Sequence, residues 1–152
     1  MIEQIKYIGS ELKPHVFANR KFLLDRSVEI VEPGSDYAVP LDRNREMLAF
    51  YHERLKSLDY VIFGHIGDAH VHVNILPNTE EEFKIGKSLM LEFARRAVAL
   101  GGTVSAEHGL GKRKAHLLEL QYTAEQIEAM KAVKRRLDPL WLLNRGNLFA
   151  AS

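Results

Sequence analysis

The 152-residue sequence contains no cysteine. This absence excludes a disulfide scaffold, a cysteine-ligated zinc or iron–sulfur site and thiol chemistry, and it fits a reducing compartment. Long apolar runs are also lacking, since none approaches the ~20 residues of a bilayer-spanning helix. The N-terminus shows no basic region followed by an apolar stretch, so it does not resemble a signal peptide. We therefore expect a cytoplasmic protein that meets a membrane only through a partner.

An excess of charge of one sign is missing as well. The 21 basic and 20 acidic residues give a formal net charge of +1, so we expect no nucleic-acid partner. Hydrophobic residues make up 46% and charged residues 27% of the chain, as in ordinary globular proteins. The length favours one domain that needs neither a disulfide nor a metal ion to fold.

Readable patterning begins only near the turn signal Pro33-Gly34. We treat residues 1–35 as a poorly patterned N-terminal segment and residues 36–152 as the folded domain. Residues 36–41 indicate a short strand with Pro40 at its end or at a sheet edge. A helix is expected from about residue 43 to residue 56, followed by a buried strand over residues 60–63.

Residues 70–75 alternate with the period of a β-strand. Hydrophobic Val71, Val73 and Ile75 fall on one face, and polar His70, His72 and Asn74 fall on the other. The turn pair Gly67-Asp68 joins this strand to the preceding one, which predicts a hairpin.

The rest of the chain reads as helix, strand and helix. Thr79 and Glu82 form the pattern of a capping box, and Gly101-Gly102 ends the helix that it opens. A strand is expected over residues 103–106, and a second capping box at Thr123 begins a helix that ends at Asp138-Pro139. The order predicts an α+β fold: a ferredoxin-like split βαβ antiparallel sheet with helices on one face, plus C-terminal helices.

Three residues form a candidate metal site. The hairpin brings His65 and His72 to neighbouring positions, where imidazoles suit Zn, Fe, Ni and Cu and an added carboxylate tolerates Mn. In this fold we expect the strand over residues 103–106 at a sheet edge, beside the strand that starts the hairpin, which would bring Glu107 to the same rim. An ordinary solvated polar face, an exposed Glu107 and a packed or solvated His108 remain the alternatives.

Three segments together resemble FAD-linked oxidases of the vanillyl-alcohol-oxidase type, which include D-lactate, glycolate and D-2-hydroxyglutarate dehydrogenases. Residues 64–74 are similar to the family's Gly-His-x-Gly-Asp-Gly-Asn-x-His-x-Asn segment. Residues 102–111 resemble its Gly-Ser/Thr-x-Ser-x-Glu-His-Gly-x-Gly segment, and residues 137–146 resemble its Leu-Asp-Pro…Leu-Asn-Pro-Gly terminus.

The resemblance implies a C-terminal, substrate-binding domain that works with FAD and a divalent metal, Zn or Mn, on a small 2-hydroxy acid. It also implies a role for each matching residue: metal ligands His65, His72 and Glu107, substrate contact Asn74, proton-accepting base His108, and Asn144 near the flavin. A divalent ion acidifies a coordinated hydroxyl, a histidine accepts its proton, and the flavin carries the redox chemistry.

Several positions depart from the family pattern. Ala69 and His70 replace its Gly-Asn, and Arg145 replaces its proline. Gly34 and Ser35 stand where some relatives place a basic residue for the substrate carboxylate. The cations that would substitute for it come from the N-terminal segment: Arg20, Lys21 or Arg26.

Nothing in residues 1–35 resembles the family's N-terminal FAD-binding domain. We therefore expect the chain to be inactive without a flavin-binding domain or subunit. A metal-dependent hydrolase and a non-catalytic ferredoxin-like binding module are the alternative functions, and a homodimer stays open.

Overall fold

The computed structural model describes residues 34–149. Most of the N-terminal segment, with Arg20, Lys21 and Arg26, lies outside the described residues. The elements run in this order: β1 (Tyr37–Ala38), a 3-10 turn (Leu41–Arg43), α3 (Asn44–Arg54), β2 (Tyr60–His65), a 3-10 turn (Ile66–Asp68), β3 (His70–Ile75), α4 (Glu80–Ala99), a 3-10 turn (Ala115–Leu117), α5 (Leu118–Gln121) and α6 (Ala124–Leu137).

The sheet is antiparallel, with strand order β1-β3-β2. The predicted hairpin is confirmed: His65 pairs with His70, and Phe63 pairs with His72. Ala69 closes the connection with a φ of +50°, in the left-handed region that favours glycine. The register places His65 diagonal to His72 on one face of the sheet, which is where alternation predicts them.

The segment over residues 103–106 differs from its prediction in two ways. It forms an isolated bridge between Thr103 and Ala38 rather than a full strand. It also lies beside β1 and not, as predicted, beside β2, which forms the opposite edge. Gly102 makes this approach feasible, because a Cβ there would collide with the carbonyl oxygen of Ala38. The loop that follows is therefore delivered to the ends of β1 and β3.

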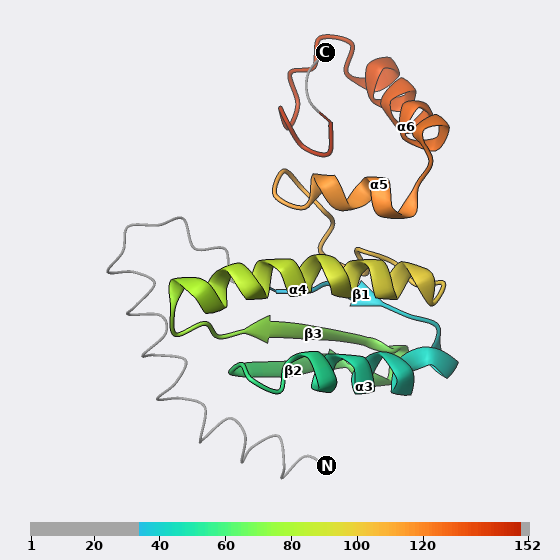
Figure 1. Cartoon of the computed structure of the whole chain (residues 1–152). Coiled ribbons are helices and arrows are strands. Elements are labelled where there is room, and N and C mark those ends of the chain that lie inside the picture. Colours follow the sequence, from blue (N-terminus) through green and yellow to red (C-terminus); the bar gives the residue numbers. More distant parts are fainter. Residues whose placement is uncertain (1–33, 150–152) are drawn as a thin grey trace.

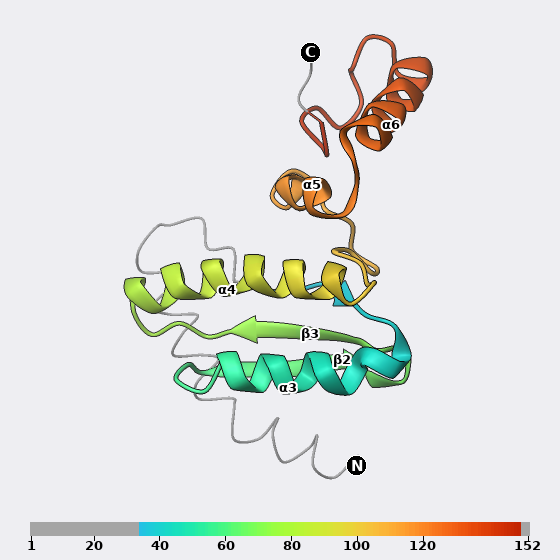
Figure 2. The ribbon, with the colours of Figure 1, turned by 45° about the vertical axis from the view of Figure 1, so that its right-hand side comes forward.

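The core lies between the sheet and the two longer helices that follow β1 and β3, as predicted. Val73 and Ile75 are fully buried in one cluster with Tyr51 of α3 and Phe93 of α4. The Tyr51 and Phe93 rings meet edge to face, with centroids 4.8 Å apart. Figures 1 and 2 show α4 running alongside β3. The α+β class with helices on the apolar face of an antiparallel sheet is confirmed.

Both long capped helices begin where the sequence predicts. Thr79 accepts a hydrogen bond from the Glu82 amide, but the Glu82 carboxylate turns to the amide of Asn78, so this capping box is half formed. At α6 the Thr123 box is complete. Residues 110–149 form a lobe that stands beyond α4 in both views (Figures 1 and 2).

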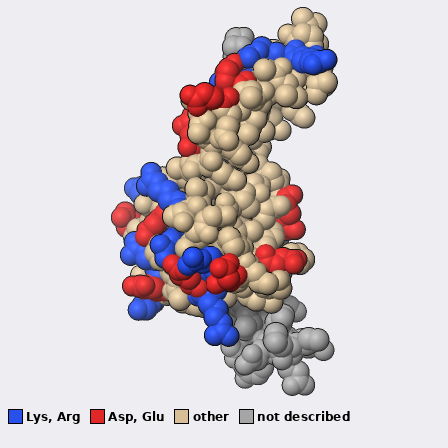
Figure 3. All heavy atoms as spheres, turned by 90° about the vertical axis from the view of Figure 1, so that its right-hand side faces the viewer, with Lys and Arg blue, Asp and Glu red and all other residues tan. Residues whose placement is uncertain are grey.

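The exposed surface mixes charges of both signs. On the face drawn in Figure 3, lysines and arginines are interspersed with acidic residues, and broad uncharged areas separate them. Within residues 34–149, no helix combines the length and apolar character needed to cross a bilayer.

Candidate functional site

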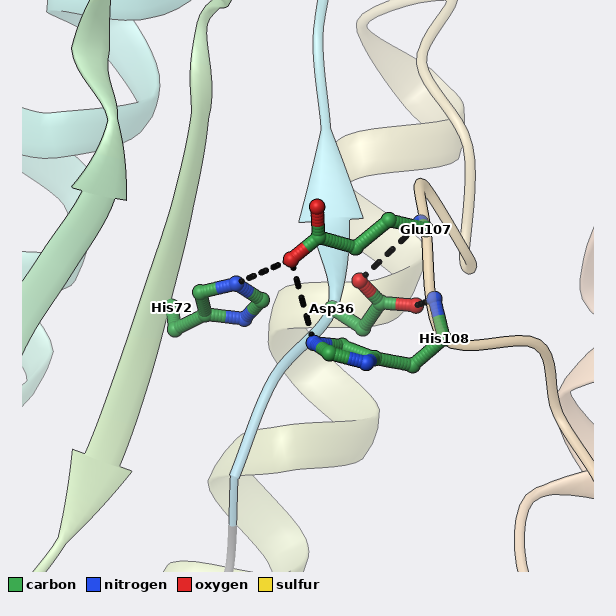
Figure 4. Close-up of side chains that lie close together, drawn as sticks. All are labelled: Asp36, His72, Glu107 and His108. Carbon is green, nitrogen blue, oxygen red and sulfur yellow. Dashed lines mark hydrogen bonds and ion pairs between the residues drawn. The ribbon is translucent and has the colours of Figure 1, made fainter.

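Four side chains meet where β1, β3 and the loop over residues 105–108 converge (Figure 4). Glu107 lies at the centre: its Oε1 is 3.1 Å from Nε2 of His72 and 3.1 Å from Nε2 of His108. Asp36 completes the group, since one potential donor atom from each of the four residues lies within 4.8 Å of the others. We call these residues, Asp36, His72, Glu107 and His108, the carboxylate–imidazole cluster.

His72 is oriented from behind by the backbone. Its Nδ1 lies 2.9 Å from the carbonyl oxygen of Ser35, and a carbonyl can only accept, so Nδ1 carries the proton. In the neutral ring, Nε2 then presents its lone pair to the Glu107 oxygen. Two acceptors 3.1 Å apart repel unless a proton or a cation lies between them. A ring held through its far nitrogen in this way is typical of metal-ligating histidines.

His65 lies at the margin of the cluster. Its Nε2 is 3.9 Å from Oε2 of Glu107, and its side chain is 63% exposed. Donors bound at about 2.1 Å to one tetrahedral ion lie about 3.4 Å apart. The His72–Glu107 separation is slightly shorter than that value and the His65–Glu107 separation slightly longer. Of the three residues that the sequence singles out, the structure brings His72 and Glu107 into contact and leaves His65 outside the group of four, 3.9 Å from the second oxygen of Glu107.

His108 is the most exposed member of the cluster, with a side chain 63% accessible against 42% for Glu107. Its backbone amide is tied to Asp36, while its ring reaches Glu107. An imidazole whose one nitrogen faces a carboxylate and whose body faces solvent is suited to accept a proton from a bound molecule.

Asp36 is the residue that sequence reasoning missed. It is 1% exposed. Burial by itself raises the pKa of its carboxyl, but hydrogen bonds from the His108 amide, the Ser105 hydroxyl and the Glu107 amide outweigh this and hold the pKa below the ordinary value. The only sequence signal was a lone acid next to an apolar strand, which carries no periodicity.

His70, a departure from the family pattern, is buried with 6% exposure. Its Nε2 lies 3.2 Å from Oδ1 of Asp36. Its ring meets His72 edge to face at a centroid distance of 4.6 Å and stacks on His65 at 6.0 Å. His70 therefore links Asp36 to the histidines of the hairpin.

Asn74 and Asn144, the two asparagines of the predicted site, are not among the residues that contact one another in the cluster. Asn74 is half-buried on β3, two residues from His72 and on the same face. Asn144 has a left-handed backbone with a φ of +47°, and its carbonyl accepts from the Asn147 amide. Within residues 34–149, no hydrogen bond joins either asparagine side chain to the cluster.

The donor set can hold a divalent cation, and it can also move a proton. Two imidazole nitrogens and a carboxylate suit zinc-like ions, while added carboxylates widen the choice to manganese. A proton can pass between the exposed His108 and Glu107. Both capacities depend on the geometry of Glu107, whose Oε1 lies 3.1 Å from both imidazoles.

Comparison with known proteins points in the same direction. The family model described as "FAD linked oxidases, C-terminal domain" matches residues 13–148. The glycolate oxidase subunit GlcD of Bacillus subtilis is 34% identical over 119 residues, which are 76% of this chain and 25% of that protein. A D-2-hydroxyglutarate dehydrogenase of Stutzerimonas stutzeri is 38% identical over 112 residues, 70% of this chain and 24% of that protein.

A third relative matches to a similar extent. The probable mitochondrial D-lactate dehydrogenase of Danio rerio is 36% identical over 119 residues, covering 76% of this chain and 24% of that protein. The chain thus spans about a quarter of the length of these relatives.

Proposed function

The chain belongs to the family of C-terminal domains of FAD-linked oxidases, and we propose that it binds substrate and metal for an FAD-dependent oxidoreductase that oxidises a 2-hydroxy acid. The observation that carries the proposal is Glu107 held at 3.1 Å between the imidazoles of His72 and His108. The relatives' names supply the substrate class, since glycolate, D-lactate and D-2-hydroxyglutarate are all 2-hydroxy acids.

The residues that would hold the metal are His65, His72 and Glu107. The fit rests on the chemistry of His72, whose Nε2 lone pair faces a carboxylate oxygen because Nδ1 donates to Ser35. A bound divalent ion, Zn or Mn, would polarise the substrate hydroxyl and lower its pKa.

The chain's own residues account for proton removal and orientation. His108 would accept the hydroxyl proton at Nδ1, because its Nε2 already faces the Glu107 carboxylate at 3.1 Å, and that carboxylate stabilises the imidazolium that results. Asn74, on the same face of β3 as His72, would contact the substrate, and Asn144 would lie near the flavin. FAD supplies the hydride acceptor when bound.

A flavin-binding domain or subunit is the partner that this proposal needs. The chain alone should therefore bind no FAD stoichiometrically and turn over no 2-hydroxy acid. The proposal places the protein in the cytoplasm, with membrane contact only through a partner. Stoichiometric, tightly bound flavin on the purified chain would contradict it.

The metal part of the proposal is tested by calorimetric titration of the full chain with Zn²⁺ and with Mn²⁺. We expect one ion per chain and a loss of at least ~10-fold in affinity for His72→Ala. Loss of a residue that supports a ligand already costs about that much, and loss of the ligand itself should cost more. His116→Ala is the matched control, since His116 is exposed and lies outside the cluster.

Two results would contradict the metal site. Equal affinities for the parent chain and His72→Ala would show that the ion binds elsewhere. An equal loss in His116→Ala would show that any exposed histidine holds it. Metal-dependent hydrolysis that is lost in His72→Ala would favour the hydrolase alternative instead.

A further inference from the structure

Every acceptor direction of the Asp36 carboxylate is occupied within the protein. Oδ1 accepts from Nε2 of His70 at 3.2 Å and from the Glu107 amide at 3.3 Å. Oδ2 accepts from the Ser105 hydroxyl at 2.9 Å and from the His108 amide at 3.0 Å. A carboxylate has about four lone-pair sites, so Asp36 has none left for an ion, although its oxygen lies within the cluster.

The same residue anchors four consecutive residues of the loop. Its carboxylate holds Ser105, Glu107 and His108, and its backbone carbonyl accepts from the Ala106 amide at 2.9 Å. The anchored loop contains both Glu107 and His108. Asp36 lies about 70 residues earlier in the chain, so this contact fixes the loop that the bridge between Thr103 and Ala38 places beside β1.

Asp36 also reaches the other half of the site through His70. The His70 ring packs against both His72 and His65, so its hydrogen bond to Asp36 braces the hairpin side as well. The buried Asp36 carboxylate thereby connects the loop over residues 105–108 to the histidines of the hairpin.

We propose that Asp36 is a positioning residue that holds Glu107 and His108 toward His72 and gives no donor atom to a bound ion. For metal affinity this inference rests on the proposed function; for loop position it stands alone. Asn at this position would offer one acceptor oxygen and one amino group. Two of the four donors would then face another donor, and the loop would lose one or two of its three hydrogen bonds to the carboxylate.

The experiment compares the full parent chain with Asp36→Asn, Ser105→Ala and Asp138→Asn. Asp138 is the matched control, because it is buried and also accepts backbone amides, from Leu142 and Leu143, but lies in the C-terminal lobe. The first readout is hydrogen exchange of the Glu107 and His108 amides without metal. The second is affinity for Zn²⁺ alone.

For Asp36→Asn we expect at least one of the two amides to exchange at least ~10-fold faster, because the new amino group faces one of them. We expect Zn²⁺ affinity to fall by ~10–100-fold, the range for loss of a ligand's support. Ser105→Ala keeps the carboxylate and removes one donor, so both effects should be smaller but measurable. Asp138→Asn should change neither. If Asp36→Asn does not fold, Ser105→Ala carries the test, and unchanged exchange in it overturns the proposal.

The two readouts separate the inference from the proposed function. If Zn²⁺ does not bind the parent chain, the proposed metal site is wrong. The amide exchange still tests whether Asp36 positions the loop. Weaker Zn²⁺ binding with unchanged amides in Asp36→Asn would make Asp36 a ligand and overturn the inference.

Discussion

Helices α4 and α6 begin with the same local device and end up in different surroundings. Each starts at a threonine whose hydroxyl accepts the amide three residues on. Five residues of α4 are buried, including Phe93, whereas none of α6 is. Of the apolar stripe of α6, Ile127 and Met130 pack partly against the core, and Val133 and Leu137 are 59% and 77% exposed. The same amphipathic pattern thus occurs in a helix whose apolar stripe is buried, α4, and in one whose apolar stripe is largely exposed, α6.

Two aspartates show a parallel contrast. Asp138 fixes the loop over residues 139–143 by accepting two amides only four and five residues away. Asp36 fixes the loop over residues 105–108 across about 70 residues. The hydrogen bonds of Asp138 can form as soon as the chain after α6 turns back. Those of Asp36 require that the sheet has already formed. The site therefore depends on the global fold in a way that the loop held by Asp138 does not.

The largest effect should come from Phe93→Ala. Phe93 is fully buried and meets the rings of Phe50 and Tyr51 edge to face. Removing it leaves a cavity, and the free energy of unfolding should fall by about 3–5 kcal/mol. Urea unfolding measures the change. A loss under about 1 kcal/mol would show that α4 does not carry the core.

Gly102→Ala should have the next largest effect, and it should reach the site. A Cβ at Gly102 would collide with the backbone of Ala38, so the segment over residues 103–106 must move. We expect a loss of about 1–3 kcal/mol in the free energy of unfolding, as for other overpacked positions, together with weaker Zn²⁺ binding.

Gly67→Ala is the matched control for Gly102→Ala, because a Cβ at Gly67 meets nothing within 4 Å. It should change neither stability nor Zn²⁺ affinity by a comparable amount. If the two alanine variants lost similar stability and Zn²⁺ affinity, the bridge between Thr103 and Ala38 would not be what positions the site.

The Asp138 loop should respond to acid. The hydrogen bond from Lys134, with those from the Leu143 and Leu142 amides, holds the pKa of Asp138 below its ordinary value. Its contribution to stability is therefore present above the unfolded pKa, about 3.9, and is lost as the pH falls through the lower folded value. NMR should show the Leu142 and Leu143 amides shifting in that range, and Asp138→Asn should abolish the shift.

The smallest effect should come from Leu137→Ala. Its side chain buries little surface, so the free energy of unfolding should change by less than about 0.5 kcal/mol. Urea unfolding of Leu137→Ala and Phe93→Ala under the same conditions compares the apolar stripes of α6 and α4 directly. A loss above about 1.5 kcal/mol would mean that the end of α6 is covered in solution.

Much of the fold was predictable because its signals are local. The turn pair Gly67-Asp68 predicted the hairpin, and alternation over residues 70–75 predicted the shared face of His65 and His72. Capping patterns gave the starts of α4 and α6. Three of the four residues of the carboxylate–imidazole cluster, His72, Glu107 and His108, were also singled out, because they stand in dense polar motifs. The edge at which residues 103–106 lie was predicted wrongly, because no local pattern says which strand a distant segment will join.

The order of the residues alone decided the helices, the hairpin and the polar row on one face, since each follows from spacings of two to four positions. Only the packed chain decided that the segment after Gly102 lies against β1, and that Asp36 there gathers Ser105, Glu107 and His108. A buried carboxylate finds its donors wherever folding brings unpaired amides and hydroxyls within reach, and that meeting joins residues about 70 positions apart.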